Sequence, residues 1–464
     1  MQIPILNGIY TDAAADFRTS YPRNMVPVPK QQGLSNGYLR PADGIISFGD
    51  GPGIGRGGIN WNDVCYRVMG TKLVSIDSSG VTTVLGDVGG SGQVALDYSF
   101  DRLGIVSNGR LYYWNGISLD QVIDVDVGIV VDLLWIDGYF MTTDGENLIV
   151  TELNNPLSVE PLKYGSSEVD PDRINGLLKL RDEAFALNRY TIEAFENIGG
   201  NGFPFQRISG AQIQKGILGT FCADIFADAI AFLGSGRNEA PAVYIGNNGQ
   251  AVKISTREID QILLGYDDLS ETVVETRLDK GHQSLLIHLP DRTLCYDLVA
   301  STAMGEPVWY ILTSSVVDYA QYRGKNLVWC YNKWLCEDPQ NTKHGYLSDS
   351  TSTHWGETTG WDFGTTIIYN DGQKAICHDL ELVCLTGRVT EGSDPVIWTS
   401  ASQDGVTWGQ ERSTKVGSRG NRNARIRWWK NGIFHNWRIQ KFRGTSDAFL
   451  SIARLEAKLE PLNV

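Results

Sequence analysis

The sequence predicts an all-β protein: a β-propeller of about six to eight blades with an irregular N-terminal arm and a C-terminal β-sandwich. Short apolar runs repeatedly meet a Gly- or Asn-containing turn and reverse into a second apolar run. Asn-Gly and Asp-Gly supply the positive φ that two-residue hairpin turns need. Copies recur roughly every 35–45 residues, the spacing of small antiparallel sheets in a propeller. The clearest are Val68–Ile76, Leu103–Trp114 and Phe140–Val150. Further copies are Val243–Ile254, Leu285–Leu298, which turns at Asp291-Arg292, and Leu327–Leu335.

With 464 residues the chain is too long for one ordinary core, and three segments can be drawn. Residues 1–58 are rich in proline and end in a glycine run, which indicates an extended arm or clasp with short strands such as Gly44–Phe48. Residues 59–350 carry the hairpin series and form the expected propeller. Residues 351–464 change to longer alternating stretches, including Ala424–Trp428 and Phe434–Phe442, and are expected to form the sandwich.

Helix signals are few. The best is Ser255–Leu264, entered through Thr256 with Glu258 following, and a second candidate is Ser270–Leu278.

The formal net charge of −14 argues against general adhesion to nucleic acid or to anionic membranes. No apolar window reaches the ~18 residues of a membrane helix, so no membrane insertion is expected. The N-terminus Met1–Pro4 lacks the positive and apolar regions of a signal peptide. Charge is segregated, however: from Arg412 to Arg443 there are ten Lys and Arg and no Asp or Glu. A neutralising contact with the acidic remainder, in the same or a neighbouring subunit, is plausible.

Seven scattered cysteines, mostly inside apolar runs, favour reduced buried thiols of a protein folded in cytoplasm. Their spacings do not match those of a structural zinc site, so neither a metal nor a cofactor is expected.

Two short motifs suggest ligands but have simpler explanations. Gly53-x-Gly55-x-x-Gly58 matches a dinucleotide fingerprint by letters, but Pro52 precedes it and the stretch after it reads as a strand, so a flexible glycine loop is preferred. The segment from Asp124 to Gly128 resembles the start of a calcium loop without its distal ligands. A strand with one solvent-exposed face explains this segment more simply.

The stretch Ser402–Trp408 resembles the Asp box of sialidase-type propellers, lacking one residue between Asp and Gly. That box is a turn device, in which the carboxylate accepts backbone N–H groups and the Trp packs underneath. The six histidines form no recognisable catalytic string, and no spacing selects a pair of carboxylates. No active site is therefore expected, and no enzyme.

Cations alternate with aromatics near the C-terminus. If two strands there were paired, Arg425, Arg427 and Arg438 could line one face. Ile426, Trp428 and Ile439 would then line the other. One interpretation is docking on an acidic partner or on phosphate; the other is a half-buried strand pair whose Arg stems cover aromatic rings. The candidate interface residues are Arg422, Arg425, Arg427, Trp429, Lys430, Arg438, Lys441 and Arg443.

Longer strings carry a family resemblance. Asn24–Lys30, Ser35–Arg40 and Ile213–Cys222 resemble the packaged-DNA stabilisation proteins, or tail hub (nozzle) proteins, of short-tailed bacteriophages. The strings Ala240–Ile245 and Ile287–Pro290 also fit. The similarity runs over most of the chain and is weakest between Tyr98 and Asp172.

This resemblance implies a structural virion protein of the tail, assembled in host cytoplasm. Members form a six-fold ring below the portal and the head-to-tail adaptor, retain the packaged DNA, and receive the tail needle and the tailspikes or tail fibres. DNA would pass through the channel without sequence-specific binding. The alternatives are a glycan-cleaving, sialidase-like depolymerase and a glycan-binding propeller that uses exposed Trp and Tyr.

Overall fold

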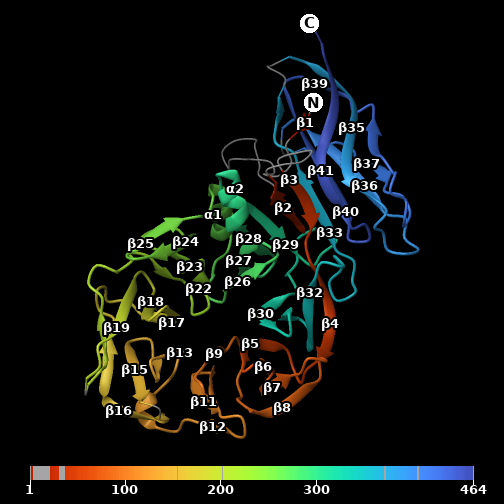
Figure 1. Ribbon diagram of the computed structural model, residues 1–464. Coiled ribbons are helices and arrows are strands. Elements are labelled where there is room, and N and C mark those ends of the chain that lie inside the picture. The colour runs from red at the N-terminus through yellow and green to blue at the C-terminus, as the bar shows by residue number, and fades with distance from the viewer. Residues whose placement is uncertain are drawn as a thin grey trace. The chain divides into compact units, whose positions relative to one another are not determined.

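The computed structural model describes residues 2–3, 21–30, 37–153, 155–200, 202–369, 373–404 and 407–462. These residues form antiparallel strands almost throughout (Figure 1). Within them lie two α-helices, α1 (Arg257–Leu264) and α2 (Leu298–Met304), and a 3₁₀ turn, η1 (Val125–Val127). The all-β prediction is confirmed.

Seven sheets of four or five strands follow one another along the described chain, within the predicted range of six to eight blades. The first sheet consists of β5 (Gly55–Trp61), β6 (Val64–Met69), β7 (Lys72–Ile76) and β8 (Thr82–Asp87). The second consists of β9 (Ala95–Tyr98), β10 (Leu103–Ser107), β11 (Arg110–Trp114) and β12 (Leu119–Gln121). The third consists of β13 (Asp132–Ile136), β14 (Tyr139–Thr143), β15 (Asn147–Glu152) and β16 (Asn155–Ser166). The fourth sheet consists of β17 (Ile174–Leu180), β18 (Glu183–Asn188), β19 (Ile192–Asn197) and β20 (Phe205–Arg207). The fifth consists of β21 (Gly216–Ile217), β22 (Ala223–Phe226), β23 (Ala229–Ser235), β24 (Ala242–Asn247) and β25 (Gln250–Lys253).

The sixth sheet contains β26 (Val273–Asp279), β27 (His282–His288), β28 (Thr293–Asp297) and β29 (Trp309–Leu312). The seventh contains β30 (Lys325–Cys330), β31 (Lys333–Glu337) and β32 (Lys343–Ser348), and its last strand is β4 (Gly44–Asp50), which comes from the N-terminal part of the chain.

The chain divides into two compact units: Met1–Ile46 with Leu278–Arg323 and Leu347–Val464, and Ser47–Arg277 with Gly324–Tyr346. In the second unit the first strands of neighbouring sheets contact one another, β5 with β9, β9 with β13, and β13 with β17, while β30 contacts β5. Figure 1 shows these sheets in orange and yellow, and that of β30 in teal, each beginning at its inner strand. This is the arrangement of propeller blades.

All six predicted hairpins form. At the β10–β11 turn Asn108 and Gly109 have φ of 51° and 75°, so both central residues occupy the left-handed region that this turn type requires. At the β14–β15 turn the Asp144 carboxylate accepts the backbone N–H groups of Glu146 and Asn147, at 2.8 and 2.6 Å. Local turn chemistry therefore fixes these reversals.

One helix prediction is confirmed and the other is wrong. Thr256 caps α1 by accepting the Ile259 N–H. The candidate Ser270–Leu278 instead contains most of β26, because its β-branched residues Thr272, Val273, Val274 and Thr276 favour an extended strand. Helix α2, which Asp297 caps at its N-terminus, was not predicted.

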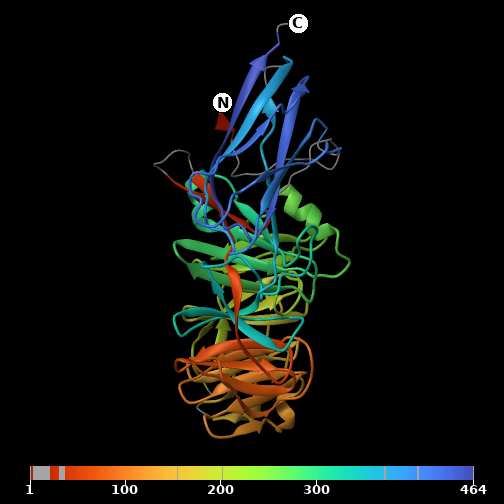
Figure 2. The same ribbon diagram turned by 90° about the vertical axis from the view of Figure 1, so that its right-hand side faces the viewer.

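The first unit also contains two further sheets, of seven and five strands, drawn mainly in blue in Figures 1 and 2. One has the order β2 (Met25–Pro29), β3 (Gly37–Pro41), β41 (Ser451–Pro461), β35 (Ala375–Leu385) and β38 (Ile426–Trp429), with β1 (Gln2–Ile3) on β41 and β39 (Ile433–Phe434) on β35. The other has the order β33 (Gly360–Gly364), β40 (Trp437–Thr445), β36 (Val396–Ser402) and β37 (Arg412–Lys415), with β34 (Ile368–Tyr369) on β40.

Side chains from both sheets share one apolar core, as in a β-sandwich. Phe363 and Phe442 stack with ring centroids 5.4 Å apart, and Trp428 packs against Phe442 at the same centroid distance. Leu382 and Leu455 are register partners in the long β35–β41 pair and are both buried. The predicted sandwich is therefore present.

Candidate functional site

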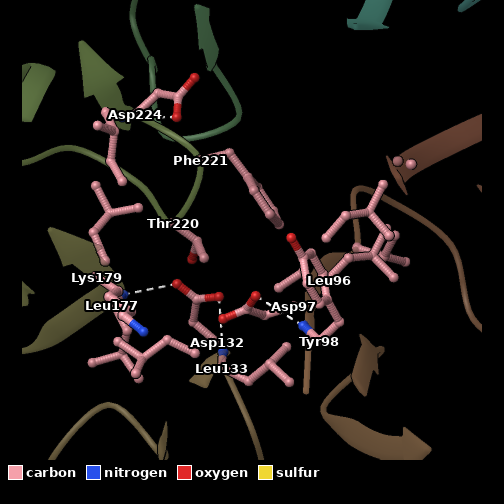
Figure 3. A pocket seen from close by; sticks show the side chains of 18 of the residues that line it. Leu96, Asp97, Tyr98, Asp132, Leu133, Leu177, Lys179, Thr220, Phe221 and Asp224 are labelled. Atoms are coloured by element: carbon pink, nitrogen blue, oxygen red, sulfur yellow. Dashed lines mark hydrogen bonds between the residues drawn. The ribbon is translucent and has the colours of Figure 1, made fainter. Parts of the chain in front are cut away.

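A cavity of about 740 Å³ lies among the inner strands of the second unit (Figure 3). Residues of β5, β9, β13, β17, β22, β26 and β30 line it. Its lining carries four carboxyl groups, from Asp97, Asp132, Asp224 and Glu275, and one ammonium group, from Lys179. The aromatic residues Tyr98, Phe100, Trp135 and Phe221 also line the cavity.

Each of these four carboxyl groups connects one inner strand to the next. Asp97 Oδ2 on β9 accepts the backbone N–H of Trp135 on β13, at 2.6 Å. Asp132 Oδ2 on β13 accepts the backbone N–H of Leu177 on β17, at 2.8 Å. Neighbouring sheets are thus tied by a side chain at their inner edges as well as by packed apolar residues.

The same relationship recurs further along the chain. Asp224 on β22 is hydrogen-bonded to the side chain and backbone of Thr276 on β26. Glu275 Oε1 on β26 accepts the backbone N–H of Leu327 on β30, at 3.1 Å. None of these four acids was predicted as a site from the sequence, because each bond joins two sheets that are separate along the chain.

Burial raises the pKa of three of these carboxyl groups. The pKa is about 6 for Asp97, about 7 for Asp132 and about 6 for Asp224, because desolvation disfavours the carboxylate more than the backbone N–H bonds favour it. Raised carboxyl pKa values in a cavity are also typical of residues that act as catalytic acids or bases. Here, however, all four carboxyl groups hold neighbouring sheets together, which gives them a structural use.

The C-terminal cations are largely neutralised within the first unit. Arg425 forms two hydrogen bonds to the Glu381 carboxylate of β35, at 2.7 and 2.6 Å, and Arg427 forms a third, at 2.6 Å. Arg443 binds Glu411 and lies over the Trp398 ring, 4.4 Å from its centroid. The neutralising contact envisaged from charge segregation is therefore made, at least in part, inside one chain.

The expected pairing of the two basic strands is wrong. β38 and β40 belong to different sheets, so Arg438 does not share a face with Arg425 and Arg427. Arg438 is buried and donates to Gln440 Oε1 and to the Asn431 carbonyl oxygen. Its burial lowers its pKa.

The other candidates are more accessible. Trp429 is 56% exposed at the end of β38, beside the exposed Lys430. Arg422 is exposed, and Lys441 on β40 is half-buried near Glu411. The described residues contain no hydrogen-bond partner for the side chains of Arg422 and Lys430. Ile426 and Trp428 are buried, as the alternation along this strand predicted.

The glycine run has a packing role. A Cβ at Gly55 would lie 2.1 Å from the Glu337 carboxyl carbon, and one at Gly53 would lie 2.6 Å from Gly70 Cα. Gly55–Trp61 is strand β5, so no helix follows as a dinucleotide site requires. Arg56, within the run, donates to the carbonyls of Gly70, Gly89 and Gly92 and to Ser107 Oγ. The segment is held in place rather than forming the flexible loop expected.

The other two motifs are turns. Asp124 caps η1, so the expected strand at this position is wrong; its Oδ1 accepts the Asp126 N–H and its Oδ2 the Val159 N–H. In the partial Asp box, Asp404 Oδ1 accepts the Thr407 N–H at 2.6 Å. Gly405 and Val406 of that box lie outside the described residues.

All seven cysteines are free thiols, and all except Cys384 are buried. No group of three or more His, Cys, Asp or Glu suited to a metal ion occurs in the described part of the chain. Within that same part, no helix is both long and apolar enough to cross a membrane.

Comparison with solved structures gives β-propellers at low sequence identity. The Neurospora crassa Pan2 WD40 domain superimposes with a TM-score of 0.44 at 10% identity, over 66% of this chain and 96% of that one. The β-propeller domain of Cps50 (Swd1) from Myceliophteria thermophila gives 0.43 at 11% identity, over 66% and 98%. Both scores are below 0.5, so the family assignment does not rest on them.

Sequence comparison is decisive. The family described as bacteriophage P22 Gp10, β-propeller, matches residues 1–352, and that described as bacteriophage P22 Gp10, β-sandwich, matches residues 360–460. The tail hub protein gp10 of Salmonella phage P22 is 29% identical over 483 residues, covering 99% of this chain and 99% of that protein. The chain therefore belongs to the bacteriophage P22 Gp10 family and is a structural protein of a phage tail.

Proposed function

We propose that this protein is a tail hub subunit that assembles as a homohexameric ring beneath the portal and the head-to-tail adaptor. The ring closes the DNA channel, retains the packaged genome, and provides attachment for the tail needle and the tailspikes or tail fibres. The observation that carries the proposal is the full-length similarity to the P22 tail hub protein, which spans both propeller and sandwich. The proposal includes three domains: an N-terminal arm of residues 1–58, a propeller of residues 59–350 and a sandwich of residues 351–464.

A tail hub must keep its shape under mechanical load, and buried polar contacts join the sheets of the second unit. Besides the inter-sheet carboxyl groups, the fully buried Arg67 on β6 forms an ion pair with Glu337 on β31, with 3.3 Å between Nη1 and Oε1. Asn326 Nδ2 donates to the same carboxylate at 2.6 Å. These polar links fix the relative positions of the first and last sheets and support a scaffold role.

The charge and thiols fit the proposed setting. A net charge of −14 disfavours adhesion to DNA, so DNA could pass through the ring without sticking. Seven free thiols are compatible with assembly in the reducing host cytoplasm before the protein becomes part of the virion tail.

The test uses DNA-filled heads that carry the adaptor but lack this protein. Added protein should sediment with the heads, and packaged DNA should become resistant to nuclease. Heads without the adaptor are the control and should gain neither. Protein that stays monomeric and leaves DNA release unchanged would contradict the proposal.

The alternative is a glycan-binding or glycan-cleaving β-propeller, and the acid-lined cavity with its aromatic residues is the observation that favours it. A screen of bacterial surface polysaccharides for released reducing ends separates the two. Binding without release supports a lectin, and release that Asp132→Ala abolishes supports an enzyme. The tail hub proposal expects neither.

A further inference from the structure

The third propeller sheet and its flanking loops carry an unusual surface. Residues 115–172 contain twelve Asp and Glu but a single basic residue, Lys163. The same segment holds nine of the 28 exposed large hydrophobic residues among the described residues, although it is about an eighth of the chain. Apolar side chains concentrated on a surface in this way mark a contact region.

Part of this surface is continuous. The Tyr164 hydroxyl donates to the Asp126 carbonyl oxygen, which places β16 against η1. Beside the hydroxyl, on η1, Val125 is 87% exposed; Leu162, two residues before Tyr164 on β16, is 79% exposed. Ile129, two residues beyond η1, is also exposed, so the apolar residues continue along the chain from η1.

An acidic groove adjoins this apolar area. It has a volume of about 740 Å³ and is lined by Ile129, Asp144, Glu146, Glu168, Asp172 and Arg173, among others. Ile129 is 72% exposed. Glu146 and Glu168 are exposed, and their carboxylates have no hydrogen bond or ion pair within the described residues. We call the groove together with Val125, Leu162 and Tyr164 the acidic face.

The same chain carries a surface of opposite charge. Among the described residues the edge strand β38 pairs with β35 and ends at the exposed Trp429, which the exposed Lys430 follows. The exposed Arg412 donates from Nη1 to the Lys430 carbonyl oxygen at 3.1 Å and from Nη2 to the Trp429 carbonyl oxygen, so it lies beside both. We call Arg412, Trp429 and Lys430 the basic edge.

We propose that the acidic face of one copy docks on the basic edge of the next copy. This inference rests on the proposed function, because a ring needs two different, complementary surfaces on each subunit. Apolar residues would meet Trp429, while Glu146 and Glu168 would meet Arg412 and Lys430. Like-charged faces would repel, so the contact would form only head to tail.

Two charge-reversal variants of the full-length protein test the contact. Glu146→Lys/Glu168→Lys makes the acidic face basic, and Arg412→Glu/Lys430→Glu makes the basic edge acidic. Each alone should raise the concentration needed for ring assembly on the adaptor by at least about tenfold. Mixed one to one, the two variants should alternate and assemble again, because every junction then joins opposite charges.

The matched control is Asp182→Lys/Asp267→Lys, which makes the same charge change at two exposed acids outside the acidic face. It should assemble like the wild type, and all variants should keep the wild-type melting temperature within a few degrees. Assembly is measured by light scattering after size exclusion, with and without the adaptor.

The outcomes separate the two proposals. If the wild type assembles and either reversal variant also assembles normally, the interface proposal fails and the tail hub proposal stands. If both variants fail to assemble and their one-to-one mixture also fails to assemble, the acidic face and the basic edge do not contact each other. A wild type that never assembles contradicts the tail hub proposal and this contact with it.

Discussion

Arg23 and Asp362 form a buried ion pair, with 2.5 Å between Nε and Oδ2 and side chains only 3% and 11% exposed. Both Nη atoms of the guanidinium also donate, Nη1 to the carbonyl oxygen of Asp318 at 2.8 Å and Nη2 to that of Val316 at 3.3 Å. The pair joins the N-terminal segment to β33 inside the first unit. Arg23 immediately precedes the string from Asn24 onward that carries part of the family resemblance. The buried ion pair therefore gives that region a physical role.

Asp362→Ala should lower the free energy of unfolding by about 3–5 kcal/mol, because it leaves Arg23 buried without its counter-ion. Chemical denaturation at pH 7 measures this. Glu391→Ala is the matched control: its partner Arg419 is 65% exposed, and the loss should stay below about 1 kcal/mol. Equal effects of the two substitutions would show that burial does not set the strength of the Arg23–Asp362 pair.

Asp132→Ala should destabilise the protein by about 1–3 kcal/mol, because the buried N–H of Leu177 loses its acceptor. The cost should depend on pH. The folded pKa of Asp132, about 7, lies above the unfolded value, so the protonated group favours the folded state. Its stabilising contribution is full below the unfolded pKa and is lost as pH rises through about 7.

The difference in unfolding free energy between wild type and Asp132→Ala should therefore be larger at pH 5 than at pH 8.5. Thermal or urea unfolding across this range measures it. Asp267→Ala, at an exposed acid, should give a difference near zero at every pH. A difference that grows with rising pH would contradict the assigned direction of the pKa shift.

Gly55→Ala should be strongly destabilising, because its Cβ would lie 2.1 Å from the carboxyl carbon of Glu337. That carboxylate cannot move away cheaply, since it is buried against Arg67 and Asn326. We expect a loss of about 2 kcal/mol or more. Gly202→Ala, where a Cβ meets no atom within 4 Å, should be nearly neutral. Comparable melting temperatures for both variants would show that the close approach at Gly55 is not real.

The hairpins could be predicted because their determinants are local. At Asn108-Gly109, two adjacent residues supply both left-handed conformations, and the flanking apolar runs specify the strands. The cap at Thr256 is local in the same sense, and α1 begins where it was expected.

The remaining features depend on contacts between residues distant in sequence. The alternation around Arg427 predicts which side chains are buried but not which sheet β38 joins, and Arg438 lies in another sheet. The bond from Asp97 to the Trp135 N–H links two repeats, so neither repeat reveals it alone. Sequence reasoning therefore found the blades and missed the carboxyl groups that connect them.

The seven thiols provide a test that does not require a ring. Burial raises the pKa of Cys222 and Cys336 to about 12, so these thiols remain protonated and poorly reactive at pH 8. Cys384 is partly exposed, and its pKa is also raised to about 12 by burial.

A thiol reagent at pH 8 should therefore label at most one cysteine in the native protein, and slowly. All seven should react once denaturant is added without reductant, because none is in a disulfide. Cys384→Ser should remove the native labelling and leave six thiols after denaturation. A count of five for the denatured wild type would mean that one disulfide had formed, which would argue against assembly in a reducing compartment.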